Sequence, residues 1–184
     1  MIKNILNILT SFFFIFVMFS CVNNDKPKYD QVVRHRVAQD DINESLEEAN
    51  RNFLIQEAGL INDYIEYHKL NVIQTGTGLR YQIHDQGDDD LIEEGDIITL
   101  EYEVRLLNGN LIYSSEIDGN KTFLVGRGGV ESGLEEAVLK LSKNSVATLI
   151  LPAHLAYGLT GDGNKVPHRA TLVYKIKVVD KIDK

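Results

Sequence analysis

Residues 97–113 read IITLEYEVRLLNGNLIY, and this stretch decides the fold class. From Ile98 to Leu106, apolar and polar side chains alternate, which is the period of a β-strand with one buried face. The Asn108-Gly109 pair that follows is typical of a hairpin turn in which both central residues have positive φ. Residues 111–113 then form the return strand. The stretch therefore predicts an antiparallel hairpin.

Further strands are predicted on both sides of this hairpin. They cover residues 79–83, 123–125, 146–151 and 172–179. One short helix interrupts them, because Ser132 and Glu135 have the spacing of a capping box and the apolar residues after them share one face. A single short helix can seal one side of a strongly twisted antiparallel sheet. We therefore expect an α+β fold over residues 71–184, with the sheet wrapped around that helix.

An additional helix is predicted before this domain. Apolar residues between 42 and 68 recur at three- and four-residue spacing, which is typical of a helix with one apolar face. Asp41 and Glu44 have the spacing of a capping box, so we expect the helical segment over residues 41–70. Gly59 is expected to kink or split it. The apolar stripe either packs on the following domain or forms a dimer or partner interface through residues 41–69.

The first residues have the pattern of a secretory signal. Lys3 is the only charge in the first 24 residues, and the apolar run from Ile5 to Phe19 is shorter than the roughly 20 residues that span a membrane. Cys21 follows, and the arrangement resembles a bacterial lipoprotein signal. We expect a signal over residues 1–20 and lipid, including palmitate, on Cys21. The alternatives are an uncleaved anchor and an ordinary signal with an incidental cysteine.

Residues 21–40 carry few apolar side chains, and we expect a polar tether there. The protein would then be anchored by lipid to a membrane of the cell envelope, facing the periplasm or lying on the outer-membrane surface. The chain of 184 residues carries 19 basic and 27 acidic side chains, for a formal net charge of −8. Such a chain repels phosphate backbones, so we expect no nucleic acid partner.

The sequence has no pattern of a nucleophilic, metal or phosphate-binding centre. Its single cysteine excludes an intrachain disulfide and a zinc site of four cysteines, and no two histidines are three or four residues apart. The glycine-rich residues 126–129 lack the Lys-Ser/Thr ending of a phosphate loop, and Ser114-Ser115 has no histidine partner at a known spacing. We therefore expect no cofactor and no metal, and a site of apolar character.

Six short stretches, taken in order, resemble the FKBP family of peptidyl-prolyl cis-trans isomerases. They are residues 101–102, 108–109, 112–115, 123–126, 130–136 and 152–174. The resemblance covers residues 78–182. Together with the signal and the N-terminal helix, it is similar to the lipoprotein FKBPs of Bacteroidetes, one branch of which is associated with gliding motility. It implies an FKBP-like fold, isomerase activity and proline-containing polypeptides as clients.

The resemblance also implies a pocket for the proline ring. It gives the catalytic part to Tyr102, to the Tyr157 hydroxyl as a donor to the substrate carbonyl, and to the backbone N–H of Glu131. It gives substrate binding to Ile112, Tyr113, Phe123, Val130, Leu134 and Tyr174. The loop 158–170 would form a flap over the site.

At five positions the chain departs from the family pattern. Leu134 stands where a tryptophan is usual, Ile112 where an aromatic residue is usual, and Tyr113 where an acid is usual. Glu131 replaces an aliphatic residue, and Lys121 replaces part of an apolar wall. Each 1.36 kcal/mol of lost transition-state binding lowers the rate about tenfold, so we expect weak or narrow activity. The alternatives are a chaperone or binding lipoprotein that uses the altered pocket or the N-terminal helix, and a structural lipoprotein with a vestigial pocket.

Overall fold

The structure is a computed structural model that describes residues 28–184. The expected signal over residues 1–20, Cys21 and the first part of the expected tether lie outside the described residues. Within the described part, no helix is both long enough and apolar enough to cross a membrane.

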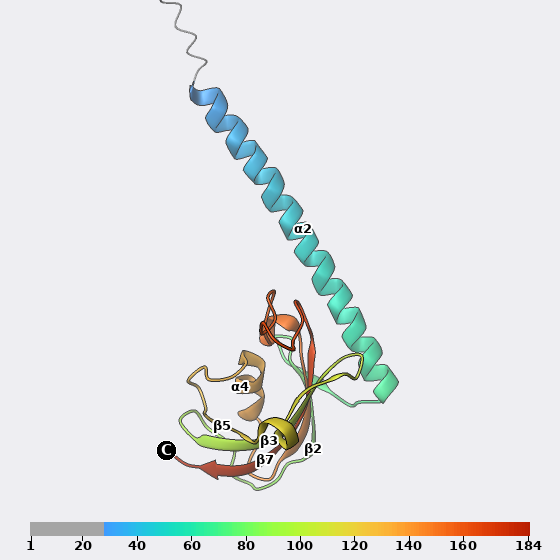
Figure 1. Ribbon diagram of the computed structural model, residues 1–184, viewed down its shortest axis with the longest axis vertical. Helices are drawn as coiled ribbons and strands as arrows, with labels where there is room; N and C mark the ends of the chain where they lie inside the picture. Colours follow the sequence, from blue (N-terminus) through green and yellow to red (C-terminus); the bar gives the residue numbers. More distant parts are fainter. Residues whose placement is uncertain (1–27) are drawn as a thin grey trace, which may run out of the picture. The chain divides into compact units, whose positions relative to one another are not determined.

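A long helix, α2 (Lys28–His68), precedes an antiparallel sheet (Figure 1). The strands are β1 (Ile73–Gln74), β2 (Arg80–Asp85), β3 (Ile97–Leu106), β4 (Leu111–Ser114), β5 (Lys121–Leu124), β6 (Val146–Leu151) and β7 (Leu172–Ile182). The short helices α3 (Ser115–Asp118) and α4 (Ser132–Val138) and the 3₁₀ helix η1 (Ala153–Leu155) interrupt them. The strand order is β1-β2-β6-β7-β3-β4, and β5 also pairs with β3.

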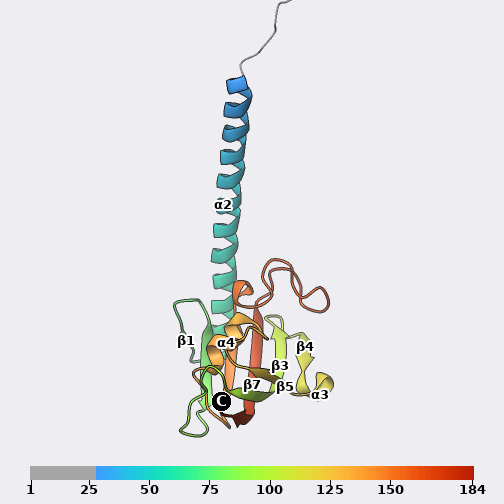
Figure 2. The ribbon, with the colours of Figure 1, turned by 90° about the vertical axis from the view of Figure 1, so that its left-hand side faces the viewer.

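Strand β3 joins the two halves of the sheet. Along its whole length it pairs with β7, while its other edge pairs first with β5 and then with β4. Its alternate residues Ile98, Leu100 and Val104 are buried, as the period of two predicts. Helix α4 lies against this face of the sheet, where Leu134 joins the same core (Figure 2). The predicted fold, an antiparallel sheet around one short helix, is confirmed.

Helix α2 begins earlier than predicted. It starts at Lys28 rather than at residue 41, so the residues expected to be a polar tether are helical from 28 onward. The chain has no glycine or proline from Lys28 to Ala58, so nothing in that stretch breaks a helix even though it is polar. The Asp41–Glu44 pair therefore lies inside the helix and does not cap it. The helix also continues through Gly59, because one glycine costs only about 1 kcal/mol relative to alanine.

The described residues divide into two units, with the boundary between Arg51 and Asn52. In the second unit, the last turns of α2 pack on the sheet: buried Ile61 contacts Ile150 of β6 and Val173 of β7. Because neighbouring residues of a strand point to opposite faces, this contact lies on the face opposite to α4. This part of the apolar stripe thus packs on the domain that follows it. A dimer or partner interface through residues 41–69 stays a prediction.

The β3–β4 turn has a different backbone from the one expected. Among its residues only Gly109 has positive φ, at 87°, whereas Asn108 does not. The Gly109 N–H donates to the carbonyl of Leu106 at 2.9 Å, and β4 starts only at Leu111. This longer connection needs a single left-handed residue, which glycine provides. The predicted hairpin is confirmed, and the prediction of two positive φ angles is wrong.

The predicted capping box of α4 is also absent. Glu131 occupies the N-cap position, and no side chain caps the helix. Glu135 instead accepts hydrogen bonds from the backbone N–H groups of Gly126 at 2.7 Å and Gly128 at 3.1 Å. The carboxylate therefore holds the glycine-rich turn that leads from β5 into α4.

Candidate functional site

Two neighbouring hollows share Lys121 and Tyr157. The aromatic hollow has a volume of about 270 Å³ and is lined by Tyr102, Val104, Tyr113, Asp118, Lys121, Tyr157 and Tyr174. The polar hollow has a volume of about 340 Å³ and is lined by Lys121, Gly128, Gly129, Val130, Glu131, Ser132, Ala156 and Tyr157. Because two side chains border both hollows, we treat them together as the pocket.

The register of the sheet brings the tyrosines of the aromatic hollow together. Val104 of β3 lies opposite Tyr113 of β4 on one side and opposite Tyr174 of β7 on the other. Directly opposite residues of antiparallel strands share a face, and Tyr102 shares it too because it lies two residues from Val104. Three tyrosines that are far apart in sequence therefore point into one hollow, and Tyr157 joins them from the loop after β6.

The side chain of Glu131 forms the charged centre of the pocket. It is only 3% exposed, and its Oε1 atom accepts a hydrogen bond from the Tyr174 hydroxyl at 2.7 Å. The ammonium of Lys121 lies 3.7 Å from Oε2. Burial raises the pKa of Glu131, but Lys121 and the hydroxyls of Tyr157 and Tyr174 lower it further, so the net pKa is below the ordinary value. The carboxylate is therefore charged at neutral pH.

One oxygen of this carboxylate is left without a hydrogen bond. Oε2 of Glu131 is buried and has no hydrogen-bond donor among the described residues. Lys121 lies too far away for a hydrogen bond, and its ammonium also lies 5.5 Å from the centre of the Tyr102 ring. The pocket thus contains an acceptor that its own side chains leave without a donor.

The tyrosine hydroxyls of the pocket act as donors. Burial and then the neighbouring Glu131 raise the pKa of both Tyr157 and Tyr174 well above the ordinary value. Burial, followed by the charges of Asp118 and Glu131, also raises the pKa of Tyr102. All three hydroxyls keep their protons at neutral pH. That of Tyr174 donates to Glu131, and those of Tyr102 and Tyr157 can donate to an oxygen atom of a ligand.

The loop from residue 152 to 171, which we call the flap loop, is organised by Asp162. Its Oδ1 atom accepts from the backbone N–H groups of Asn164 and Val166, each at 2.8 Å. Its Oδ2 atom accepts from the hydroxyl of Tyr113, which ties the loop to the aromatic hollow. Gly161 is required here, since a Cβ atom would lie 2.2 Å from the Val166 carbonyl oxygen.

Most of the predicted site residues line the pocket. They are Tyr102, Tyr113, Val130, Glu131, Tyr157 and Tyr174. The other three, Ile112, Phe123 and Leu134, line neither hollow and belong to or pack against the core. Phe123 lies opposite Ile98 and shares its inward face, while Leu134 is a fully buried residue of α4. A leucine is shorter than the tryptophan usual in the family and stays within the core.

Sequence reasoning missed two charged features of the pocket. It assigned to Glu131 a backbone contact only, whereas the carboxylate itself lies in the pocket. It treated Lys121 as a missing part of a wall, whereas this lysine borders both hollows. The available signal was the coincidence of two opposite charges at positions where the resemblance implies apolar side chains.

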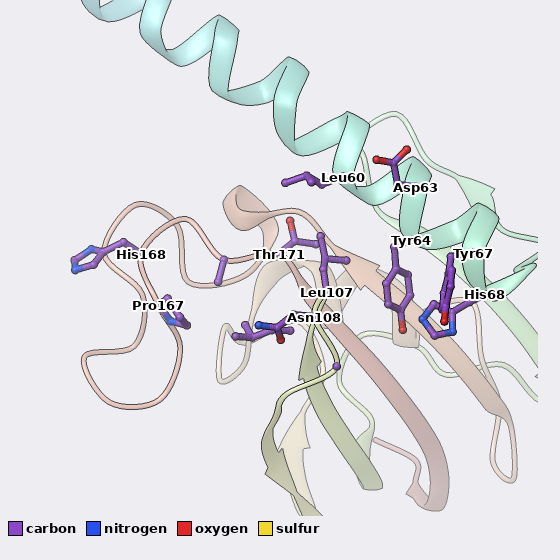
Figure 3. Close-up of a pocket in the computed structure, with 13 residues that line it drawn as sticks. Leu60, Asp63, Tyr64, Tyr67, His68, Leu107, Asn108, Pro167, His168 and Thr171 are labelled. Carbon is purple, nitrogen blue, oxygen red and sulfur yellow. The ribbon is translucent and has the colours of Figure 1, made fainter.

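A separate and larger groove of about 800 Å³ lies at the end of α2 (Figure 3). We call it the helix groove. Figure 3 shows Tyr64, Tyr67 and His68 of α2 on one side, with the β3–β4 turn and the end of the flap loop along the others. The Tyr64 and His68 rings contact each other, with centroids 4.2 Å apart and planes tilted by 38°. The helix groove contains none of the predicted site residues.

Comparison with known proteins identifies the family. Residues 89–179 match the family described as FKBP-type peptidyl-prolyl cis-trans isomerase. The probable FKBP-type peptidyl-prolyl cis-trans isomerase FkpA of Neisseria meningitidis is 38% identical over 112 residues, which are 60% of this chain and 40% of that protein. The chain belongs to the FKBP family. FK506-binding protein 2 of Debaryomyces hansenii is 36% identical over 87 residues, covering 47% of this chain and 64% of that protein.

The fold agrees with this membership. The crystal structure of FkpA from Escherichia coli matches this FKBP chain with a TM-score of 0.62 at 21% identity, covering 96% of this chain and 81% of that chain. At that identity the likeness concerns the fold alone. The chain spans less than half the length of the Neisseria meningitidis relative, at 40%, and 15% of human FKBP9. The described residues contain no group of three side chains suited to hold a metal ion.

Proposed function

We propose that the protein is a peptidyl-prolyl cis-trans isomerase that binds the twisted Xaa-Pro amide in the pocket. The observation that carries this proposal is the aromatic hollow, in which Tyr157 presents a protonated hydroxyl beside Tyr102, Tyr113 and Tyr174. Membership of the FKBP family supports it. The clients would be proline-containing polypeptides that fold outside the cytoplasm.

The reaction needs no covalent step. Rotation about a peptide bond costs about 18–20 kcal/mol because the C–N bond is partly double, and Xaa-Pro exchange takes tens to hundreds of seconds without a catalyst. A catalyst must bind the twisted amide better than the planar one. The twisted amide has lost resonance, so its carbonyl carries less charge separation and tolerates a drier site. Aromatic walls and one or two fixed donors are sufficient for this purpose.

The charged centre of the pocket limits this activity. Glu131 places a buried negative charge beside the Tyr157 hydroxyl and raises its pKa, which makes this hydroxyl a weaker donor to a substrate carbonyl. Leu134 adds no flat surface beneath the proline ring, because it is fully buried. We therefore propose a slower or narrower activity than the family pattern implies.

The proposed location is the cell envelope. It rests on the sequence alone, since the apolar run before Cys21 resembles a lipoprotein signal. Lipid on Cys21 would anchor the protein to a membrane. Mass spectrometry of the purified protein would test this, because lipidation makes Cys21 the first residue and adds acyl chains, whereas an intact N-terminus contradicts the proposal.

The isomerase activity can be tested by exchange NMR on a series of Xaa-Pro peptides with the full chain in detergent. We expect acceleration of cis/trans exchange, and an at least tenfold loss of that acceleration in Tyr157→Ala, which removes the donor and part of the wall. A surface change at the other end of the sheet, such as Ile73→Ser in β1, serves as the control. Absence of acceleration for every peptide, with a folded protein, would overturn the proposal.

The second candidate function is binding without efficient catalysis. The helix groove favours it, because it offers exposed Leu60 and Tyr67 outside the pocket. In this case the protein would hold apolar stretches of unfolded clients as a chaperone. Suppression of aggregation of an unfolded test protein, retained in Tyr157→Ala but lost in Tyr67→Ser, would distinguish this function from isomerase activity.

A further inference from the structure

Both ends of the flap loop meet at one carboxylate of helix α2. The Oε1 atom of Glu57 accepts a hydrogen bond from the backbone N–H of Ala153 at 2.7 Å. The same atom accepts a second bond from the hydroxyl of Thr171, also at 2.7 Å. Ala153 lies just after β6 and Thr171 just before β7, so these two residues begin and end the loop. Figure 3 shows the Thr171 side chain turned toward α2.

These contacts belong to a ring of interactions that begins at Glu57 and returns to α2 at Phe53. We call this ring the circuit. From Glu57 it passes to Ala153, whose carbonyl accepts from the Gly158 N–H at 2.7 Å. The Gly158 carbonyl then accepts from the Arg169 N–H at 3.1 Å. The guanidinium of Arg169 lies 4.7 Å from the centre of the Phe53 ring. Phe53 and Glu57 are four residues apart and so lie on the same side of α2.

The circuit encloses the backbone that carries Tyr157. Gly158, whose N–H and carbonyl are both engaged in it, is the next residue after Tyr157. Glu57 is itself 6% exposed, so its two hydrogen bonds are shielded from water and hold their geometry. Helix α2 therefore restrains the position of Tyr157, the residue proposed to face the substrate.

We propose that Glu57 is a positioning residue of the isomerase site: it joins the two ends of the flap loop and thereby fixes Tyr157 in the pocket. The kinetic part of this inference rests on the proposed function, whereas the structural part does not. Helix α2 then contributes a positioning residue to the site, although Glu57 lies outside residues 89–179, which match the family. Small displacements of a substrate-facing donor cost large factors in rate, so fixing the loop affects turnover.

Glu57 has a second effect that the test must separate from the first. Arg80 is buried, and the charge of Glu57 compensates part of the cost of burying its guanidinium. Glu57→Gln keeps an oxygen acceptor at the same place and removes the charge. Glu57→Ala removes both. The comparison of these variants isolates the hydrogen bonds to the flap loop.

The test uses two readouts on the full chain in detergent. Hydrogen exchange, resolved at the amides of Gly158 and Arg169, reports on the flap loop directly. Exchange NMR on an Xaa-Pro peptide reports on turnover. The matched control is Ile61→Ala, which removes buried packing from the same helix and leaves Glu57 in place. Thr171→Val removes one of the two hydrogen bonds.

We expect Glu57→Ala to lower protection of the two amides about tenfold or more, as the loss of hydrogen bonds to a buried carboxylate implies. The acceleration of peptide exchange should fall with it. Thr171→Val should have a smaller effect, and Glu57→Gln should keep most of the protection. Ile61→Ala should lower the stability of the whole domain without a selective change at Gly158.

Two results would overturn the inference. One is unchanged protection of Gly158 and Arg169 in Glu57→Ala. The other is an equal loss in Ile61→Ala and Glu57→Ala when they are compared at equal stability, which would reduce Glu57 to a stabilising residue. If the unaltered protein does not accelerate peptide exchange, the proposed function fails, and amide protection alone then decides whether Glu57 fixes the loop.

Discussion

Two regions of the protein each bury a glutamate carboxylate, and they differ in how that carboxylate is hydrogen-bonded. One is the wall of the pocket around Glu131, and the other is the base of the flap loop around Glu57. Both glutamates are buried, at 7% and 6% exposure, and both accept a hydrogen bond from a hydroxyl group at 2.7 Å. Glu57 also binds the backbone N–H of Ala153. Glu131 has an oxygen without a donor. A buried carboxylate oxygen that accepts two hydrogen bonds, as Oε1 of Glu57 does, stabilises the fold, whereas Oε2 of Glu131 is buried without that compensation.

The largest loss of stability should come from removing the hydrogen bonds of Glu57. Glu57→Ala leaves the N–H of Ala153 buried without an acceptor and removes the compensating charge near Arg80. We expect a loss of about 2–4 kcal/mol in the free energy of unfolding, measured by urea denaturation. Thr171→Val should cost about 1 kcal/mol, since it removes a single bond. A loss below about 0.5 kcal/mol in Glu57→Ala would contradict the assignment.

The next effect sharpens the comparison at Glu131. Glu131→Leu leaves the Tyr174 hydroxyl buried without an acceptor, and we expect it to cost about 1–3 kcal/mol of stability. The double change Glu131→Leu with Tyr174→Phe removes both partners and should recover most of this loss. It also removes the charge that raises the pKa of the Tyr157 hydroxyl, so acceleration of exchange in an apolar Xaa-Pro peptide should rise. An unchanged or lower rate in the folded double variant would argue against the inhibitory role of Glu131.

A pH series distinguishes the charge of Glu131 from its shape. The pKa of Glu131 is lowered in the folded protein, so its charge stabilises the fold above the unfolded value of about 4.3. That contribution is lost as the pH falls through the lower folded value. The stability difference between the unaltered protein and Glu131→Gln should therefore shrink below about pH 4. Denaturation at several pH values measures it, and a difference that grows in acid would be inconsistent with a lowered pKa.

The smallest effect is expected at the tip of the flap loop. Tyr113→Phe removes the hydroxyl that donates to Asp162, but the carboxylate keeps the N–H groups of Asn164 and Val166. Because this part of the loop is half-exposed, we expect a cost of about 0.5 kcal/mol. Amide exchange at Val166 should rise only slightly. A larger effect here than in Glu57→Ala would mean that the tip, not the base, fixes the loop.

The strands and the aromatic side of the pocket could be predicted from the sequence. A period of two identifies the buried face of β3, and residues on that face, such as Tyr102, necessarily point toward the core side. The resemblance to the FKBP family then located Tyr157 in the loop after β6. These features follow from local patterns or from motif spacing that resembles the family, so they did not depend on knowing the packing in advance.

The charged contacts could not be predicted in the same way. Glu131 meets Tyr174 across 43 positions of the sequence, and Glu57 meets Thr171 across 114. No local period encodes such partners, since they depend on the packing of separate elements. The early start of α2 was missed for a related reason: polar composition suggested a tether, while the absence of helix-breaking residues decided the structure.

The edges of the sheet bear on how the protein meets its clients. Strand β1 has two residues, and β4 and β5 have four each, while the edge along β2 contains a bulge between Ile83 and Asp85. Short or irregular edges offer few backbone groups for an added strand. An isomerase continually encounters extended, unfolded chains, which could add to an open sheet and remain there. Under the proposed function, such edges would favour release of each client after isomerisation of its proline over addition of the client to the sheet.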